Sequence, residues 1–305
     1  MSPRRAPRGA PAAATLAACA LIALALPAAA GAAGVKVIRG VVYGTAAVGA
    51  PKAGKASLLM DIYRPDAADS RRRPAVVLVH GGGFVSGRRT DVAGYASALA
   101  ARGVIAASID YRLEGQAPVP SKAFMQLATA MKDANLGPAY PDAPAVAAAV
   151  QDALTALDYL RHNASKLRIR TSRLGLLGSS AGAVTVDSVA YTAPGYGIRV
   201  PRLRFVASLW GGMIVPAPGG RPAITGLRRG APPLFLVHGD ADKTVPVALS
   251  DAMYARARDQ RVAAEYYRIA GAGHGWSASR IYTQRTPGDQ TVFDRMVDYA
   301  VGRLR

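Results

Sequence analysis

Ser180 is the residue whose surroundings most clearly predict chemistry. It stands at the centre of residues 178–182 (GSSAG), a G-x-S-x-G pentapeptide that follows the apolar run 174–177 and precedes a stretch of small residues. Between a strand and a helix, this pattern holds a serine on a tight turn that needs a glycine on each side. Ser179 is the competing hydroxyl, but it is not centred between the two glycines. Because a serine hydroxyl is a weak nucleophile until a neighbouring base takes its proton, Ser180 predicts a base and a carboxylate elsewhere in the chain.

Three other polar segments each follow an apolar run, as Ser180 does. They are residues 80–84 (HGGGF), 238–242 (HGDAD) and 271–276 (GAGHGW). If the runs are strands of a parallel sheet, their carboxyl ends meet at one edge, and the three segments gather near Ser180. Serine, aspartate and histidine then follow one another in that order along the chain.

The chain has four histidines, and His274 is the predicted base because it lies in a glycine-lined loop after the penultimate predicted element. His80 and His238 end buried runs, where a histidine usually bonds to the backbone and holds a loop. His162 lies near a predicted helix end, at a generic surface position. An imidazole that activates a serine also needs a carboxylate to fix its tautomer.

Apolar runs that alternate with helix-like stretches predict the fold class. The run 75–79 is continuous, as in a strand buried on both faces of a parallel sheet. The alternation implies right-handed crossovers and a doubly wound, mainly parallel α/β sheet with helices on both faces. The predicted strands are 35–43, 58–63, 75–79, 104–109, 174–177, 205–209, 234–237 and 264–269, and the predicted helices are 91–102, 145–162, one directly after Ser180, 247–260 and 290–304.

With these segments in order, the chain resembles the α/β-hydrolase esterases and lipases, especially the hormone-sensitive-lipase-like and BD-FAE-like esterases with an HGGG oxyanion motif. The motifs are HGGG at 80–83, DYRL at 110–113, GSSAG at 178–182 and GDADKTVP at 239–246. The resemblance covers about residues 56–300. It implies the α/β-hydrolase fold and hydrolysis of carboxylic esters through an acyl-enzyme intermediate, for which no metal or cofactor is needed.

The resemblance also assigns the remaining site residues. The family's HGxxDxxVP loop puts the carboxylate at Asp242, and Asp240 is expected to cap or brace that loop. The oxyanion that forms on the attacked carbonyl would be met by the backbone N–H groups of Gly82, Gly83 and Ala181. Preset donors of this kind are typically worth about 3 kcal/mol each.

Residues 1–33 are predicted to be a signal peptide. Three arginines precede the apolar stretch 12–26, and small residues follow it, which is the order of a secretory signal with its cleavage site. A retained N-terminal anchor and a lipoprotein signal ending at Cys19 are the alternatives. The remainder, 34–305, is predicted to be one exported domain, periplasmic or extracellular, that contains no cysteine and therefore no disulfide.

The chain is strongly basic, with 38 Lys and Arg against 19 Asp and Glu and a formal net charge of +19. Three of the arginines lie within 1–33, so the remainder carries +16. The basic residues are scattered in short runs without interleaved aromatics: 71–73, 88–89, 228–229 and 303–305. This pattern predicts solvated surface charge and no nucleic-acid partner, with attraction to anionic polymers or membranes as the alternative.

Two stretches are expected to set specificity as cap or pocket loops. Segment 114–143 departs from the family pattern, and its apolar residues predict one amphipathic helix, either over the site or packing a small core of its own: Phe124, Met125, Leu127 and Met131. Segment 213–233, rich in Pro and Gly, is expected to line the acyl or alcohol side of the pocket. Just before the first stretch, Asp110 is expected from the resemblance to make structural bonds around Arg112.

These observations predict an exported serine esterase that uses Ser180, His274 and Asp242 on a small-molecule or polysaccharide-linked ester. A prolyl-oligopeptidase-like peptidase is the nearest alternative, because GDADKTVP also resembles that group, although the chain lacks the length for its propeller domain. The other alternative is an α/β-hydrolase module that binds a ligand without catalysis. Such a module should have lost a triad member, and none is missing.

Overall fold

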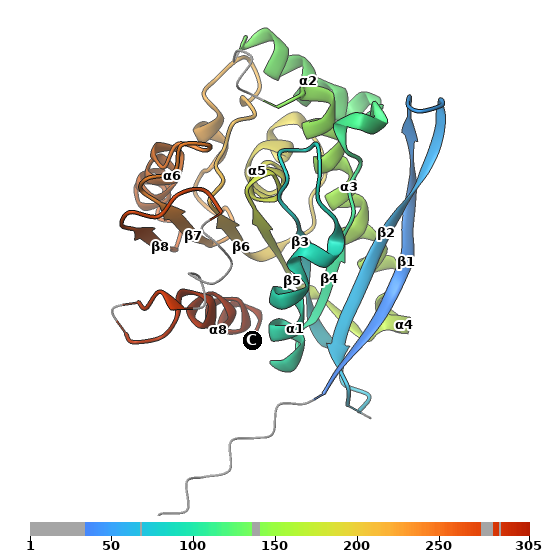
Figure 1. Cartoon of the computed structure of the whole chain (residues 1–305), viewed down its shortest axis with the longest axis vertical. Coiled ribbons are helices and arrows are strands. Elements are labelled where there is room, and N and C mark those ends of the chain that lie inside the picture. Colours follow the sequence, from blue (N-terminus) through green and yellow to red (C-terminus); the bar gives the residue numbers. More distant parts are fainter. Residues whose placement is uncertain (1–33, 68, 136–140, 276–282, 287) are drawn as a thin grey trace, which may run out of the picture. The chain divides into compact units, whose positions relative to one another are not determined.

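The computed structural model describes residues 34–67, 69–135, 141–275, 283–286 and 288–305, and its centre is one eight-stranded sheet (Figure 1). The strand order is β1-β2-β4-β3-β5-β6-β7-β8. β2 runs antiparallel to both β1 and β4, and all other neighbours are parallel. The predicted doubly wound, mainly parallel α/β sheet is therefore confirmed. The strands are β1 (Val35–Val48), β2 (Gly54–Pro65), β3 (Arg73–Val79), β4 (Ile105–Ile109), β5 (Ile169–Ser179), β6 (Leu203–Leu209), β7 (Leu234–Gly239) and β8 (Ala264–Ile269).

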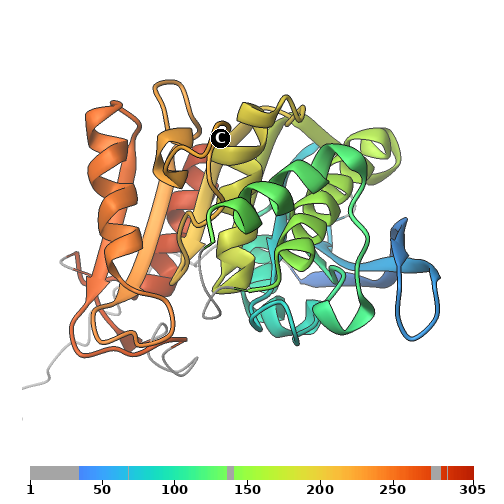
Figure 2. The ribbon, with the colours of Figure 1, turned by 90° about the horizontal axis from the view of Figure 1, so that it is seen from above.

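Helices cover both faces of the sheet because its central strands are apolar on both. Along β3, Val77 and Val79 enter one hydrophobic cluster while Val76 and Leu78 enter the other, as expected for side chains that alternate between faces. The first cluster is closed by α2 (Lys122–Asp133), α3 (Ala143–His162), α5 (Ala181–Asp187) and α6 (Ala248–Asp259), and the second by α1 (Ala93–Ala101) and α8 (Val292–Leu304). Figure 2 shows these helices from above.

The helix predicted in segment 114–143 exists, but it does not form a core of its own. In α2 the side chains of Phe124, Leu127 and Met131 are buried within the same cluster as α3 and the sheet, and Met125 packs against that cluster half-buried. Helix α2 therefore extends the main core over α3. Residues 136–140 of this segment lie outside the described residues.

The strands define two edges that matter for function. Val79, Ser179, Gly239 and Ile269 end their strands at one edge, called here the carboxyl edge, and the opposite edge is called the amino edge. Strand β1 starts at the amino edge, because Val35 pairs with the last residue of β2. Within the described residues, no helix has the length and apolar character needed to cross a membrane.

Candidate active site

Ser180 stands on a sharp turn at the carboxyl edge, between the last residue of β5 and the first residue of α5. Its φ of 53° and ψ of −122° are unusual for a residue with a side chain. The turn is tight because α5 packs against the strand ends: a Cβ on Gly178 would come within 2.2 Å of the carbonyl oxygen of Gly182, and one on Gly182 within 2.1 Å of that of Val79. The glycines of the pentapeptide are therefore required by packing.

Ser180, His274 and Asp242 are brought together from three separate loops. Ser180 Oγ lies 2.8 Å from Nε2 of His274, and Nδ1 of the same ring lies 2.7 Å from Oδ2 of Asp242. The Asp242 side chain is fully buried, whereas the His274 side chain is 20% exposed. The arrangement leaves the Ser180 hydroxyl and the His274 imidazole open to a ligand and keeps the carboxylate away from water.

Asp242 is held in its ionised form by its neighbours. Burial favours the neutral acid, but hydrogen bonds from the Val245 amide, His274 and the Thr244 amide outweigh it and hold the pKa of Asp242 below its ordinary value. Both amides donate to Oδ1, at 2.9 and 2.8 Å. An ionised Asp242 accepts the Nδ1–H of His274, so Nε2 is left free to accept the Ser180 proton.

His238 braces the same carboxylate from the other side. Its Nε2 lies 3.1 Å from Oδ2 of Asp242 and 3.0 Å from the Val245 carbonyl oxygen, and its Nδ1 lies 2.7 Å from Ser250 Oγ. Burial lowers the pKa of His238, so the neutral ring donates from Nε2 and accepts from Ser250. The hydrogen bond of His238 to the backbone agrees with the prediction from the sequence. The sequence did not predict its contact with Asp242, although the two residues are only four positions apart in one loop.

The HGGG loop lies directly against the serine. A Cβ on Gly81 would be 3.1 Å from the Ser180 Cβ, so a side chain at this position would crowd the serine. Gly82 and Gly83 have φ values of 115° and 62°. Within the described residues, the amides of these two glycines and of Ala181 donate to no protein acceptor. They are thus available to an oxygen atom on a bound molecule.

His80 and Tyr111 support this loop from beneath. Their rings stack with centroids 4.3 Å apart, and the Tyr111 hydroxyl donates to the His80 carbonyl at 3.3 Å. Nδ1 of His80 lies 2.6 Å from the Gly81 carbonyl oxygen, and burial lowers the pKa of the ring. His80 therefore holds its loop through the backbone, as the sequence predicted.

The expectation that Asp110 bonds around Arg112 is wrong. Asp110 accepts from the amide and guanidinium of Arg89, at 2.6 and 2.5 Å. Arg112 instead pairs with Asp152 of α3: the guanidinium donates to that carboxylate at distances down to 2.8 Å, and both side chains are buried. The sequence did not identify Asp152 because the two residues are forty positions apart and Asp152 lies on an otherwise apolar helix face.

The other competing residues have ordinary structural surroundings. Asp240 accepts from the Gly271 amide at 2.7 Å and so braces the loop before His274, as expected. His162 is exposed, and its Nδ1 lies 2.8 Å from the carbonyl oxygen of Asp158 in the same helix. Ser179 is buried as the last residue of β5. In the described part of the chain, no group of three or more His, Cys, Asp or Glu could hold a metal ion.

Segment 213–233 divides between the two edges, so the expectation that all of it lines the pocket needs correction. Gly219 and Gly220 lie beside α2, where they border a hollow. The part from Gly226 to Pro233 lies at the amino edge, because it leads into the start of β7. That second part is on the side of the sheet opposite Ser180.

Comparison with known proteins supports the fold and the class. The BD-FAE family model matches residues 60–126 and 140–194. The matched segments include the HGGG loop and Ser180, whereas Asp242 and His274 lie beyond them. The gap from 127 to 139 falls within segment 114–143, which the sequence had set apart.

Two curated relatives share parts of the chain. Esterase LipC of Mycobacterium tuberculosis is 28% identical over 256 residues, which is 72% of this chain and 57% of LipC. The non-reducing polyketide synthase trt4 of Aspergillus terreus is 28% identical over 154 residues, which is 47% of this chain and 5% of the synthase. The chain therefore spans little more than half of the first protein and a small part of the second.

Solved structures share the architecture over nearly the whole chain. An esterase of Thermogutta terrifontis, Est2, aligns with a TM-score of 0.59 at 22% identity and covers 88% of this chain and 90% of that chain. Its apo form aligns with a TM-score of 0.61 at 22% identity and covers 90% and 97%. This likeness shows the α/β-hydrolase fold.

The fold is that of the α/β-hydrolases. Over parts of its length, the chain is also similar to the BD-FAE family and to an esterase. The resemblance drawn from the sequence is thereby confirmed.

Proposed function

We propose that this chain is an exported serine hydrolase that cleaves carboxylic esters through an acyl-enzyme intermediate. The observation that carries the proposal is the continuous pair of hydrogen bonds from Ser180 Oγ through His274 to Asp242, at 2.8 and 2.7 Å. The esterase relatives support the same reaction class. Export rests on the N-terminal sequence alone.

In the proposed reaction, Ser180 Oγ attacks the ester carbonyl carbon and its proton passes to Nε2 of His274. The carbonyl oxygen takes the negative charge and accepts from the amides of Gly82, Gly83 and Ala181. When the C–O bond breaks, the Nε2 proton goes to the leaving alcohol and an ester to Ser180 remains. Water then attacks this ester, again with His274 as base, and releases the acid.

A panel of substrates tests the function. We expect hydrolysis of p-nitrophenyl esters, with Ser180→Ala reducing the rate by at least about 10³-fold. Feruloyl and acetyl-xylan esters test the polysaccharide-linked substrates, and peptides test a prolyl-oligopeptidase-like activity. Cleavage of peptides without esters would overturn the proposal in favour of a peptidase, and no turnover of any of them would favour a binding module.

Labelling tests the proposed nucleophile separately from the substrate. A fluorophosphonate probe should label the wild-type chain and not Ser180→Ala; labelling that survives the substitution would exclude Ser180 as the nucleophile.

A further inference from the structure

Arginines that are scattered along the sequence gather at the amino edge of the sheet. One hollow there, of about 660 Å³, is lined by five of them and by no carboxylate: Arg202, Arg204, Arg228, Arg229 and Arg303. A second hollow, of about 270 Å³, is lined by six more: Arg72, Arg73, Arg102, Arg170, Arg173 and Arg305. We call these eleven residues the arginine edge.

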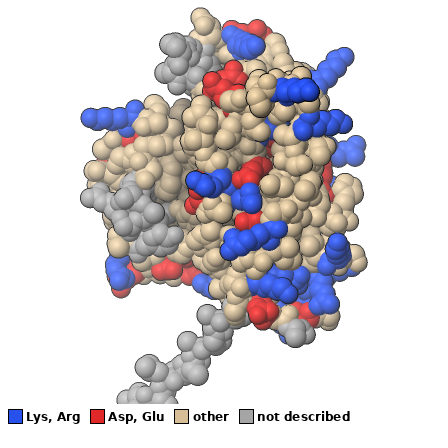
Figure 3. All heavy atoms as spheres, turned by 45° about the vertical axis from the view of Figure 1, so that its right-hand side comes forward, with Lys and Arg blue, Asp and Glu red and all other residues tan. Residues whose placement is uncertain are grey.

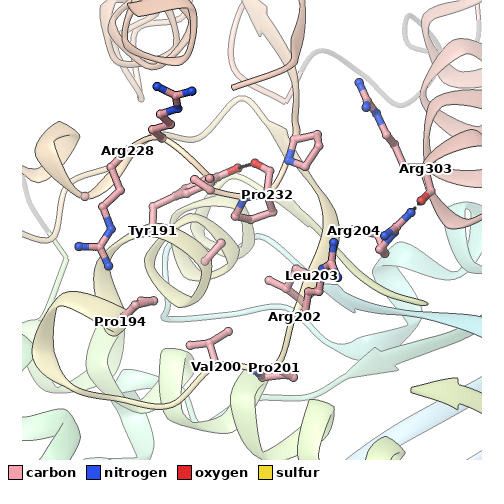
Figure 4. Close-up of a pocket in the computed structure, with 16 residues that line it drawn as sticks. Tyr191, Pro194, Val200, Pro201, Arg202, Leu203, Arg204, Arg228, Pro232 and Arg303 are labelled. Carbon is pink, nitrogen blue, oxygen red and sulfur yellow. Dashed lines mark hydrogen bonds between the residues drawn. The ribbon is translucent and has the colours of Figure 1, made fainter. Parts of the chain in front are cut away.

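The two hollows flank the last turn of α8. Arg204 Nε donates to the Arg303 carbonyl at 3.3 Å, and Arg173 Nη1 donates to the Leu304 carbonyl at 2.7 Å. In the first hollow, Arg228 stands on one side and Arg202, Arg204 and Arg303 on the other, with Pro232 and Tyr191 between them (Figure 4). The arginine edge therefore offers two adjacent hollows, and together they span a wider surface than one small ligand would cover.

Little negative charge balances this edge. Asp69 pairs with Arg73 and Asp298 with Arg102. The other nine arginines form no ion pair with any described residue. Eleven arginines against two aspartates account for more than half of the net charge of +16 that the chain carries after residue 33. On the side drawn in Figure 3, by contrast, basic and acidic side chains are interspersed.

The geometry favours a broad anionic surface as the partner. Guanidinium groups bind phosphate oxygens in a fork of two hydrogen bonds, and hollows lined by several guanidinium groups suit headgroups that carry this group. Ser180 lies at the opposite edge and would stay accessible.

We propose that the arginine edge docks on an anionic phospholipid surface, with phosphate headgroups seated in the two hollows. The proposal takes up the alternative of attraction to an anionic surface, because the scattered runs of basic residues converge in space. The proposal concerns a face remote from Ser180 and does not depend on the esterase reaction.

Co-sedimentation of the full chain with vesicles tests the proposal. We expect binding at 0.15 M salt to vesicles of equal parts phosphatidylglycerol and phosphatidylcholine, and little to phosphatidylcholine alone. The test variant combines Arg72→Gln, Arg170→Gln, Arg202→Gln and Arg228→Gln, whose side chains are exposed and make no hydrogen bond or ion pair within the described residues. Binding should weaken at least about 30-fold, since each basic residue near such a surface contributes substantially and salt screens only part of it.

A matched variant separates the effect of the arginine edge on binding from the effect of the net charge of the chain. Lys52→Gln, Lys55→Gln, Lys122→Gln and Lys132→Gln together remove the same charge from exposed positions on the β1–β2 hairpin and α2. This variant should bind within about threefold of the wild type. An equal loss in both variants would overturn the proposal, as would equal binding to neutral vesicles, which would point to the N-terminal apolar stretch.

A competition experiment separates lipid from acidic polysaccharide. Soluble polygalacturonate at the same charge concentration should displace only a small part of the chain from the vesicles. Complete displacement would overturn the lipid assignment in favour of an acidic polymer. Thermal unfolding of both variants, which should match the wild type, shows that the loss of binding is not a loss of fold.

Discussion

His238 and His274 contact the same oxygen atom, Oδ2 of Asp242, at 3.1 and 2.7 Å. The carboxylate is therefore fixed from two directions, and His238 is a positioning residue for the proposed base. Because the neutral His238 ring also bonds Ser250 through Nδ1, its orientation is set independently of His274.

Replacing His238 with leucine should lower kcat about 10- to 100-fold and leave KM within about twofold, since small misplacements of catalytic groups cost this much. Ser250→Ala is the matched control, because it leaves the Nε2 contact intact and should cost less than about threefold. A wild-type kcat in His238→Leu would remove the positioning role.

Gly182→Ala and Gly302→Ala make the same change in two helices with opposite expected results. In α8, Gly302 is exposed with open space around its Cβ position, so alanine should stabilise the fold by about 0.5–1 kcal/mol. In α5, a Cβ on Gly182 would meet the Val79 carbonyl oxygen at 2.1 Å. Gly182→Ala should therefore destabilise by roughly 2 kcal/mol or more and abolish labelling of Ser180. Denaturant unfolding measures both, and an equal gain in the two variants would contradict the packing account.

The buried pair of Arg112 and Asp152 should be strongly coupled. Asp152→Leu leaves a buried guanidinium without its carboxylate and should lower the free energy of unfolding by about 3–5 kcal/mol. Adding Arg112→Met should restore part of that loss, since an apolar pair needs no compensating charge. Additive losses in the double variant, measured by urea unfolding, would show that Arg112 acts mainly through its bonds to the Ala47 and Val119 carbonyls.

Asp187 should make stability depend on pH. It is fully buried in α5 with one hydrogen bond, from Ser208 Oγ at 2.8 Å, and burial raises its pKa to about 8. The folded state therefore keeps a proton that the unfolded state loses near pH 4, so this group's contribution to stability is full below that pH and declines up to about pH 8. Asp187→Asn should flatten the decline and stabilise the fold at pH 8 by roughly 2–4 kcal/mol. Thermal unfolding at pH 5 and pH 8 would refute this assignment if both chains showed the same pH dependence.

The sequence predicted the sheet because strand and helix periods alternate clearly, and it predicted that the segments of Ser180, residues 238–242 and His274 lie together because strand ends converge. The choice of Asp242 within its segment came from the resemblance to the family's loop. The partners of Arg112 and Asp110 could not be predicted in this way. Asp152 belongs to an apolar helix face where a carboxylate carries no local signal, and Arg89 reaches Asp110 across a loop whose path depends on tertiary packing. The gathering of the arginines at the amino edge could not be predicted either, because these residues come from widely spaced segments of the chain.

The proposed nucleophile, Ser180, and the proposed base, His274, follow strands that have different numbers of neighbours in the sheet. The Ser180 amide donates to the Leu209 carbonyl of β6 at 2.9 Å, and β5 lies between β3 and β6 in the sheet. His274 follows β8, which in the described part of the chain is an edge strand that pairs with β7. On heating, we expect β8 and its loop to separate first, so that activity is lost reversibly a few degrees below the temperature at which the central strands melt. We therefore expect the edge strand β8, which precedes His274, to be the least stable element of the proposed site.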